Sequence, residues 1–280
     1  MGAIDDHRVS EREPIARYYA KGFEQDRLSR GIGALEFART CDVLRRRLPP
    51  SPADVADVGG GPGRYTLWLA DAGYRVQLLD PVELHVEQAR ASIARAGLSS
   101  RASAELGDAR KLSLADESVD AALLLGPLYH LIDAADRIRA LSEARRVCRP
   151  NGVIIAAAIS RFASTLDGLR GGYLADPVFA DIAAADRATG THLNPTDEPN
   201  YFTTAYFHRP EELAHECGSA GLSHEATLAV EGPAWLLGDL ESRLDDPRLR
   251  AILLDALAAT ESEPSLLGVS AHLLVIARRG

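Results

Sequence analysis

A short apolar segment that runs directly into a cluster of glycines constrains this 280-residue chain more than any other feature. Residues 54–58 have the length and apolar character of a buried parallel strand. Four glycines follow within five positions, and glycine permits positive φ angles and a close approach of backbone to ligand. A helix comes next and ends at Gly73. This order is typical of nucleotide-binding units in open α/β sheets, whose ligands lie beyond the carboxyl ends of the strands.

The spacing of the glycines excludes two common nucleotide-binding motifs. When the dinucleotide fingerprint Gly-x-Gly-x-x-Gly starts at Gly59, Arg64 falls where the third glycine must be. When it starts at Gly60, Pro62 falls at the second glycine. The P-loop fails as well, because no Gly-Lys-Ser or Gly-Lys-Thr follows. The pattern that the chain does contain is Asp-x-Gly-x-Gly-x-Gly, formed by Asp57, Gly59, Gly61 and Gly63.

The chain continues as an alternation of strand and helix patterns, which predicts its fold class. Apolar runs typical of strands occupy residues 54–58, 74–79, 102–106, 120–125, 153–159, 225–230 and 271–277. Amphipathic helix patterns occupy residues 82–96, 134–148 and 210–220. Strands joined by helical crossovers imply right-handed connections and a doubly wound sheet. We therefore expect an α/β fold with a mostly parallel, seven-stranded sheet.

Two regions depart from this alternation. Residues 1–50 have helical spacing and are expected to form an N-terminal helical cap, which leaves residues 51–280 as the main domain. Residues 161–208 are rich in aromatic residues and turns. An insertion of this length in an α/β domain usually covers a binding site, so we expect residues 161–208 to form a lid.

Composition restricts the partners and the location. The net charge of -9 argues against a nucleic-acid partner, because phosphate binding requires a concentrated basic surface. No stretch approaches the ~18 apolar residues of a membrane span, and residues 1–13 lack the apolar stretch of an export signal. The three cysteines are far apart, so neither a disulfide framework nor a zinc site is indicated. We expect a cytoplasmic protein without a bound metal, and we allow for a homodimer.

The glycine motif resembles the first motif of the class I S-adenosylmethionine-dependent methyltransferases. The similarity extends over residues 54–160 and implies a Rossmann-like fold with S-adenosylmethionine as cofactor. By this resemblance Asp57 orders the glycine loop and the methionine end of the cofactor. Asp80, at the end of the second strand, corresponds to the acid that holds the ribose hydroxyls. Asp108, followed by Ala109, corresponds to the acid that binds the adenine amino group.

Each of these acids also has a structural interpretation. Asp57 could cap the following helix, Asp80 could serve the turn before Pro81, and Asp108 could solvate a loop. Three acids at the carboxyl ends of three successive strands nevertheless favour cofactor binding, because ligands bind at that edge of the sheet. A carboxylate that accepts two hydroxyl protons makes strong charge-assisted hydrogen bonds, which suits the role expected of Asp80.

Candidates for the acceptor side follow the fourth strand. Leu125 ends that strand and is expected to line the cofactor site, and Tyr129 is a candidate contact for the reacting groups. His130 is a candidate general base, because imidazole titrates near neutral pH. Its structural alternative is a hydrogen bond to backbone. In the insertion, His192 and His208 are candidate acceptor contacts, with core packing as the alternative.

The N-terminal cap supplies two further cofactor candidates. Tyr19 lies in a segment that covers the cofactor in similar enzymes. The forked guanidinium of Arg39 is well shaped for the methionine carboxylate, whereas a salt bridge to Glu36, three residues away, is the local alternative. The motifs Leu-Glu-Phe-x-Arg-Thr and Leu-Gly-Pro-Leu-Tyr-His-Leu are similar to an actinobacterial subfamily of small-molecule methyltransferases.

These features predict transfer of the S-adenosylmethionine methyl group to an oxygen, nitrogen or carbon nucleophile of a small molecule, such as a secondary metabolite. Because a sulfonium is already a reactive methyl donor, the protein is expected to supply alignment and exclusion of water. The alternative is a methyltransferase fold that binds the cofactor for regulation, cyclisation or decarboxylation. An NAD-linked oxidoreductase is disfavoured by the failed glycine register.

Overall fold

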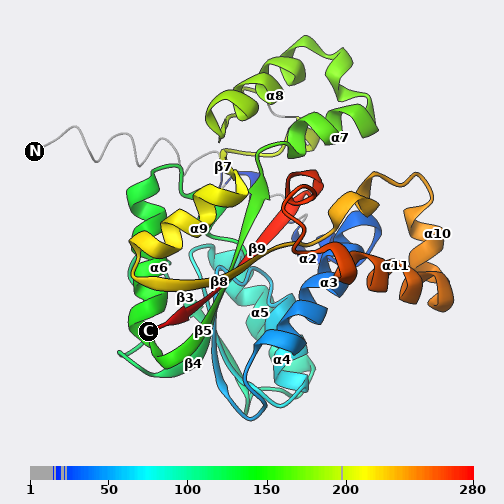
Figure 1. Ribbon diagram of the computed structural model, residues 1–280. Helices are drawn as coiled ribbons and strands as arrows, with labels where there is room; N and C mark the ends of the chain where they lie inside the picture. Colours follow the sequence, from blue (N-terminus) through cyan, green and yellow to red (C-terminus); the bar gives the residue numbers. More distant parts are fainter. Residues whose placement is uncertain (1–14, 16, 20–21, 23, 197) are drawn as a thin grey trace, which may run out of the picture.

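The computed structural model describes residues 15, 17–19, 22, 24–196 and 198–280 (Figure 1). Its strands are β1 (Asp54–Val58), β2 (Arg75–Asp80), β3 (Ala102–Leu106), β4 (Val119–Leu124), β5 (Cys148–Ser160), β6 (Thr191–His192), β7 (Ala205–His208), β8 (Leu222–Ala229) and β9 (His272–Arg279). Its α-helices are α2 (Glu24–Arg27), α3 (Gly31–Arg47), α4 (Arg64–Asp71), α5 (Glu83–Arg95), α6 (Ala134–Val147), α7 (Ala163–Gly171), α8 (Pro177–Thr189), α9 (Pro210–Ser219), α10 (Leu240–Asp245) and α11 (Pro247–Thr260). Short 3-10 turns include η1 (Leu128–His130), η3 (Pro199–Tyr201) and η4 (Gly232–Leu236).

The central sheet confirms the predicted fold class. Parallel strands follow the order β3-β2-β1-β4-β5, and β9 then pairs antiparallel with both β5 and β8. The seven predicted strands correspond to β1 through β5, β8 and β9. The strand order reverses between β1 and β4, so the carboxyl end of β1 is the expected ligand crevice of this sheet.

The described residues contain two further strands that the sequence did not predict. Four residues of β7 continue the sheet beyond the end of β5, where Ile159 pairs with Phe207 in parallel register. The two residues of β6 pair antiparallel with β7. Segments this short carry no readable periodicity, which is why residues 161–208 were expected to be turn-rich only.

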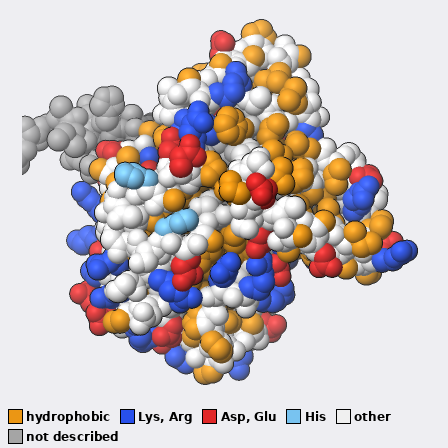
Figure 2. All heavy atoms as spheres, in the orientation of Figure 1, with side chains coloured by type: hydrophobic (Ala, Val, Ile, Leu, Met, Phe, Trp, Pro, Cys, Tyr) orange, Lys and Arg blue, Asp and Glu red, His pale blue; other side chains and the backbone are white. Residues whose placement is uncertain are grey.

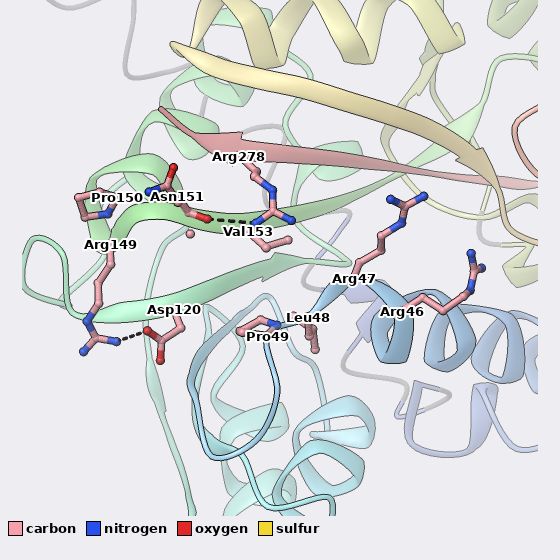
Figure 3. A pocket seen from close by; sticks show the side chains of 11 residues that line it. Arg46, Arg47, Leu48, Pro49, Asp120, Arg149, Pro150, Asn151, Val153 and Arg278 are labelled. Atoms are coloured by element: carbon pink, nitrogen blue, oxygen red, sulfur yellow. Dashed lines mark hydrogen bonds and ion pairs between the residues drawn. The ribbon is translucent and has the colours of Figure 1, made fainter.

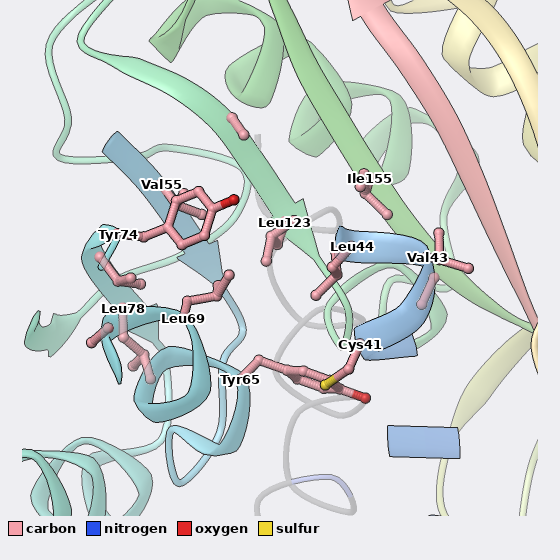
Figure 4. Packing of buried hydrophobic residues seen from close by; sticks show 14 of the residues in the cluster. Cys41, Val43, Leu44, Val55, Tyr65, Leu69, Tyr74, Leu78, Leu123 and Ile155 are labelled. Carbon is pink, nitrogen blue, oxygen red and sulfur yellow. The ribbon is translucent and has the colours of Figure 1, made fainter. Parts of the chain in front are cut away.

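Apolar side chains form a core on each face of the sheet. On one face, α3, α4 and α5 contribute residues such as Leu44, Leu69 and Ile93 to a cluster that also holds Val55 and Leu123 from the strands (Figure 4). On the other face, α6 and α9 pack against the strands through a second cluster. Helices on both faces bury a parallel sheet completely, which explains the uninterrupted apolar runs of β1 and β4. Helix α3 therefore belongs to this core as well as to the N-terminal region.

Two helical additions stand apart from the sheet (Figure 1). Residues 161–208 contain the helices α7 and α8, which enclose a small core of their own around Phe179 and Ile182. Residues 230–270, between β8 and β9, contain α10 and α11, a helical pair that the sequence reading did not anticipate. Apolar side chains gather on the surface of both additions in Figure 2. Leu169 of α7 and Ile252 of α11 are among the exposed apolar residues.

None of the described helices combines the length and apolar character that crossing a membrane requires. The three cysteines, Cys41, Cys148 and Cys217, are buried and unpaired, and burial raises the pKa of each thiol to about 12. Buried thiols with a raised pKa are unreactive core residues.

Candidate functional site

A cavity of about 350 Å³ lies at the carboxyl ends of β1, β2, β3 and β4. Ten of the fourteen site residues expected from the sequence line it: Tyr19, Asp57, Gly59, Gly61, Asp80, Asp108, Ala109, Leu125, Tyr129 and His130. The four that do not are Gly63, Arg39, His192 and His208. A single cavity thus brings together side chains from the N-terminal region, four strand ends and the turn η1.

The glycine loop forms the floor of this cavity and needs glycine for two different reasons. Gly59 and Gly61 have φ angles of 69° and 56°, which side chains rarely adopt. A Cβ atom on Gly59 would lie 2.8 Å from Cδ of Pro127, so the loop is packed tightly on one side. A Cβ on Gly61 would meet nothing closer than 3.8 Å, so its other side is open toward α2. Gly63, with a φ of 88°, precedes α4 and has a structural role.

Asp57 is fully buried beneath this loop and is incompletely satisfied. Its Oδ2 accepts a hydrogen bond of 2.6 Å from the Thr66 hydroxyl, whereas Oδ1 has no partner among the described residues. Burial raises the pKa of Asp57 to about 6, although the Thr66 hydrogen bond opposes the shift and nearby Asp80 adds to it. A buried acceptor without a donor costs free energy. Buried polar atoms of this kind are a common feature of ligand sites.

Asp80 is the last residue of β2 and links the loop to the next helix. Its Oδ2 accepts the Gly61 N–H at 2.9 Å, and its Oδ1 accepts the Val82 N–H at 2.9 Å. His85, on α5, approaches Oδ1 through Nδ1 at 3.1 Å, and its buried Nε2 has no partner among the described residues. His85 lines the cavity but was missed in the sequence, because it follows no strand end and its pairing with Asp80 depends on helix geometry.

Asp108 is clamped by an arginine that the sequence reading also missed. The Arg110 guanidinium donates to both carboxylate oxygens of Asp108, at 2.9 Å and 2.6 Å, and bridges to Asp136 at 2.5 Å. Ala109 between them is buried. The clamp fixes the orientation of the Asp108 carboxylate at the cavity wall, where it remains 41% exposed.

At the opposite end, His130 is held by two other segments of the chain. Its Nδ1 donates to the Thr204 carbonyl at 3.2 Å, which leaves Nε2 to accept the Tyr19 hydroxyl at 2.6 Å. Burial lowers the pKa of His130 to about 4, so the imidazole is neutral at physiological pH. The rings of Tyr19, Tyr129 and Phe202 surround it, with centroids 4.7 to 5.8 Å away.

Arg39 is not a cavity residue, and the structure corrects that prediction. Its side chain is fully buried on α3 and donates to Asp42, to Glu261 and to the Val230 carbonyl. The local alternative, a pairing with Glu36, is also wrong. Glu36 instead pairs with Arg27 of α2, at 2.5 and 3.0 Å, and Arg27 does line the cavity.

The two histidines of the insertion serve packing rather than the cavity. His192 is buried between Asp186, at 2.9 Å, and the Tyr201 carbonyl, at 2.8 Å, and its ring stacks on Phe207. His208 is buried with Nε2 at 3.2 Å from Glu216. Neither lines the cavity, so the structural alternative describes both.

A second hollow lies at the amino-terminal edge of the sheet, away from the strand ends that carry the site (Figure 3). Arginines dominate its lining, but Arg149 donates to Asp120 at 2.7 Å and Arg278 donates to the Asn151 carbonyl at 3.1 Å. Arg46 is engaged by Glu261. Arg47 closes the last turn of α3, where basic side chains interact favourably with the helix dipole. Three of its four arginines are thus paired, whereas the buried Nε of Arg47 has no partner among the described residues.

The sheet order, the glycine floor and the acids at successive strand ends define a Rossmann-like cofactor-binding protein. Residues 55–152 match a family described as "Methyltransferase domain". An uncharacterised methyltransferase of Mycobacterium tuberculosis is 35% identical over 124 residues, which are 43% of this chain and 47% of that protein. The methyltransferase GfsG of Streptomyces halstedii is 34% identical over 43% of each chain. The matched segments thus span less than half the length of these relatives.

Solved structures share the fold at low sequence identity. A methyltransferase of Methanosarcina mazei aligns with a TM-score of 0.57 and 20% identity, covering 85% of this chain and 96% of its own. The 1,6-didemethyltoxoflavin-N1-methyltransferase of Burkholderia thailandensis aligns with a TM-score of 0.57 and 15% identity, covering 99% and 90%. The match over residues 55–152, the partial relatives and the shared fold support a class I S-adenosylmethionine-dependent methyltransferase domain, and S-adenosylmethionine is the cofactor that these similarities imply.

The cavity fits that cofactor by its own chemistry. The open glycine floor leaves room for a ligand close to the protein backbone. Among the described residues, Oδ1 of Asp57 and Nε2 of His85 have no hydrogen-bond partner, so a bound ligand could supply one. Carboxylates at positions 80 and 108 face the same cavity and accept hydrogen bonds from hydroxyl or amino groups. These donor and acceptor types match an amino-acid-bearing nucleoside.

Proposed function

We propose that this protein transfers the methyl group of S-adenosylmethionine to a nucleophilic atom of a small-molecule acceptor. One observation carries the proposal: a single cavity has acids and a glycine floor at one end and a ring-lined, hydrogen-bonded histidine at the other. The bound cofactor would supply an electrophilic methyl group. What the chain must then provide is alignment, exclusion of water and, for a hydroxyl acceptor, a place for the proton.

In this proposal the strand ends bind the cofactor. Asp80 would accept the ribose hydroxyls with its remaining lone pairs, with His85 beside it as a further hydrogen-bonding group. Asp108, oriented by Arg110, would accept the adenine amino group. Gly59 to Gly61 would let the backbone approach the amino-acid portion, where Asp57 lies beneath the loop. These roles rest on the residues that line the cavity and, for Asp57 and His85, on polar atoms that have no partner among the described residues.

Tyr19 and His130 would handle the acceptor proton. As the acceptor oxygen is methylated, its proton moves to the Tyr19 oxygen while the Tyr19 proton moves to Nε2 of His130. The Thr204 carbonyl stabilises the resulting imidazolium through Nδ1–H, and the proton is later lost to water. Because the pKa of His130 is lowered to about 4, Nε2 is unprotonated at neutral pH and accepts the Tyr19 hydroxyl, although the same shift makes the imidazole a weaker base.

The surroundings of His130 support an aromatic or otherwise apolar small molecule, such as a secondary metabolite, as the acceptor. Tyr19, Tyr129 and Phe202 present ring faces and edges there, and aromatic ligands pack favourably against them. The B. thailandensis neighbour is named for its action on 1,6-didemethyltoxoflavin, a small heterocycle. The net charge of -9 gives no support to a nucleic-acid acceptor.

A labelled-methyl experiment tests the proposal. The protein is incubated with methyl-labelled S-adenosylmethionine and a small-molecule extract, and both labelled product and S-adenosylhomocysteine are measured. We expect both with the wild type and neither with Asp80→Ala. A neighbour of the same fold is titled a [4+2]-cyclase, with a TM-score of 0.56 and 18% identity. Cofactor binding without any S-adenosylhomocysteine formed would therefore contradict methyl transfer and favour such a non-methylating role.

A further inference from the structure

Arg27 occupies a particular place at the cofactor cavity. It ends the short helix α2, and Glu24 of the same helix lies over the open side of Gly61. The Arg27 guanidinium donates through Nε to Glu24 at 2.8 Å and through both Nη atoms to Glu36. A guanidinium has five N–H donors, so two remain after these three bonds. Arg27 can therefore hold a ligand carboxylate while Glu36 holds Arg27.

Glu36 is in turn the first member of a chain of charges that leads away from the cavity. His272, the first residue of β9, has its Nδ1 3.9 Å from Glu36 and 2.6 Å from Glu231. Glu231 is fully buried at the end of β8, where it also accepts hydrogen bonds from the Ser270 hydroxyl and the His272 N–H. When the imidazole is protonated, the charges therefore alternate along this row: positive at Arg27, negative at Glu36, positive at His272 and negative at Glu231.

The surroundings of His272 favour its protonated form. Burial by itself lowers the pKa of an imidazole, but the attraction of Glu36 and Glu231 outweighs burial, and the pKa of His272 is raised to about 9. Glu36, Glu231 and His272 also place ligand atoms within 4.8 Å of one another, as in a metal site. The imidazolium and the Arg27 guanidinium already supply the positive charge at this place, which makes a charge chain the better assignment.

We propose that His272 and Glu231 are positioning residues that hold Arg27, through Glu36, for the carboxylate of the cofactor's methionine portion. This inference rests on the proposed cofactor site. Without the imidazolium, Glu36 would face only Arg27 and would draw the guanidinium toward α3, away from a ligand. Strands β8 and β9 would then determine cofactor affinity, although neither His272 nor Glu231 lines the cavity.

The test compares two ligands that differ only in the amino-acid end. S-adenosylhomocysteine carries the carboxylate, whereas 5′-methylthioadenosine lacks the whole amino-acid group. Calorimetric titration of the full chain should show that His272→Gln and Glu231→Gln weaken S-adenosylhomocysteine binding roughly tenfold, the effect of one charge-assisted contact, and leave 5′-methylthioadenosine unchanged. His224→Gln, an exposed histidine on β8, is the matched control and should alter neither affinity.

A double-mutant cycle separates positioning from general loss of structure. Arg27→Ala should weaken S-adenosylhomocysteine binding, and adding His272→Gln should cost nothing more, because the second residue acts through the first. Equal weakening of both ligands by His272→Gln, or an unchanged affinity for S-adenosylhomocysteine, would overturn the inference while the proposed function stood. Failure of the wild type to bind either ligand would instead overturn the proposed function.

Discussion

Asp57→Asn offers a test in which stability and cofactor binding should change in opposite directions. The pKa of Asp57 rises from 3.8 to about 6 because the folded protein buries the carboxylate. The neutral form is therefore favoured on folding, and the unfolding free energy falls as pH rises from about 4 through about 6. Each pKa unit corresponds to about 1.36 kcal/mol, so ionised Asp57 costs the folded wild type roughly 3 kcal/mol at pH 7.

Asparagine removes this ionisation and keeps an oxygen that can accept the Thr66 hydroxyl. Its amide nitrogen would take the place of the unpartnered Oδ1 and cost about 1–3 kcal/mol at every pH. The decisive quantity is thus the pH dependence of the difference in unfolding free energy between the variant and the wild type. Urea denaturation of both proteins, without ligand, should show this difference rising by roughly 2.5 kcal/mol in favour of the variant between pH 4 and pH 7.

A matched control comes from the other end of β1. The pKa of Asp54 is lowered, mainly by its hydrogen bond with Arg75, so its contribution to stability is lost as pH falls and Asp54→Asn should change stability in the opposite direction. S-adenosylhomocysteine should bind less tightly to Asp57→Asn, because the loop loses its buried carboxylate. A difference between wild type and Asp57→Asn that stays constant from pH 4 to pH 7 would refute the assigned burial cost.

Two further predictions concern the floor and the far end of the cavity. Gly59→Ala places a Cβ 2.8 Å from Pro127 at a φ of 69° and should weaken S-adenosylhomocysteine binding. The control, Gly97→Ala, has the same φ but open space around the Cβ, so it should lose only the ~1–2 kcal/mol of stability expected of a left-handed alanine. Unchanged S-adenosylhomocysteine binding by Gly59→Ala would show that the loop tolerates side chains. Tyr19→Phe and His130→Gln should each slow methyl transfer to a hydroxyl acceptor by about 10²-fold, measured as labelled product. The double variant should be no slower than either single variant, because both residues act on the same proton. Additive losses of rate would contradict the proposed proton transfer through Tyr19 to His130.

Much of the fold could be predicted from the sequence because it depends on local patterns. The seven main strands are continuous apolar runs between turn residues, and the glycine spacing identified the loop. The helices α10 and α11 were not predicted; of their residues only Leu240 and Leu257 are buried, so they form no broad core-facing stripe. The strands β6 and β7 could not be predicted, since six residues carry no readable period.

The residues of the candidate site also fall into two groups, those that local sequence patterns predict and those whose positions depend on tertiary packing. Asp57, Asp80 and Asp108 follow strand ends, so the topology places them at one edge. Arg39 was assigned wrongly to the methionine carboxylate because the shape of its guanidinium suits that group, whereas its nearest partner, Glu261, lies 222 positions away. Arg27 depends equally on tertiary packing, because its contact with the cavity requires α2 to dock over the glycine loop. Long-range ion pairs of this kind leave no spacing signal in one sequence.

Binding of S-adenosylhomocysteine tests the central claim, that the strand ends hold this cofactor, most directly. Calorimetric titration should give one site per chain in the wild type and at least tenfold weaker binding in Asp80→Ala, because the variant loses both the ribose acceptor and the carboxylate that holds the Gly61 N–H. NADH should give no binding isotherm. Absence of S-adenosylhomocysteine binding to the wild type, or equal affinity in Asp80→Ala, would contradict the cofactor site described for this chain.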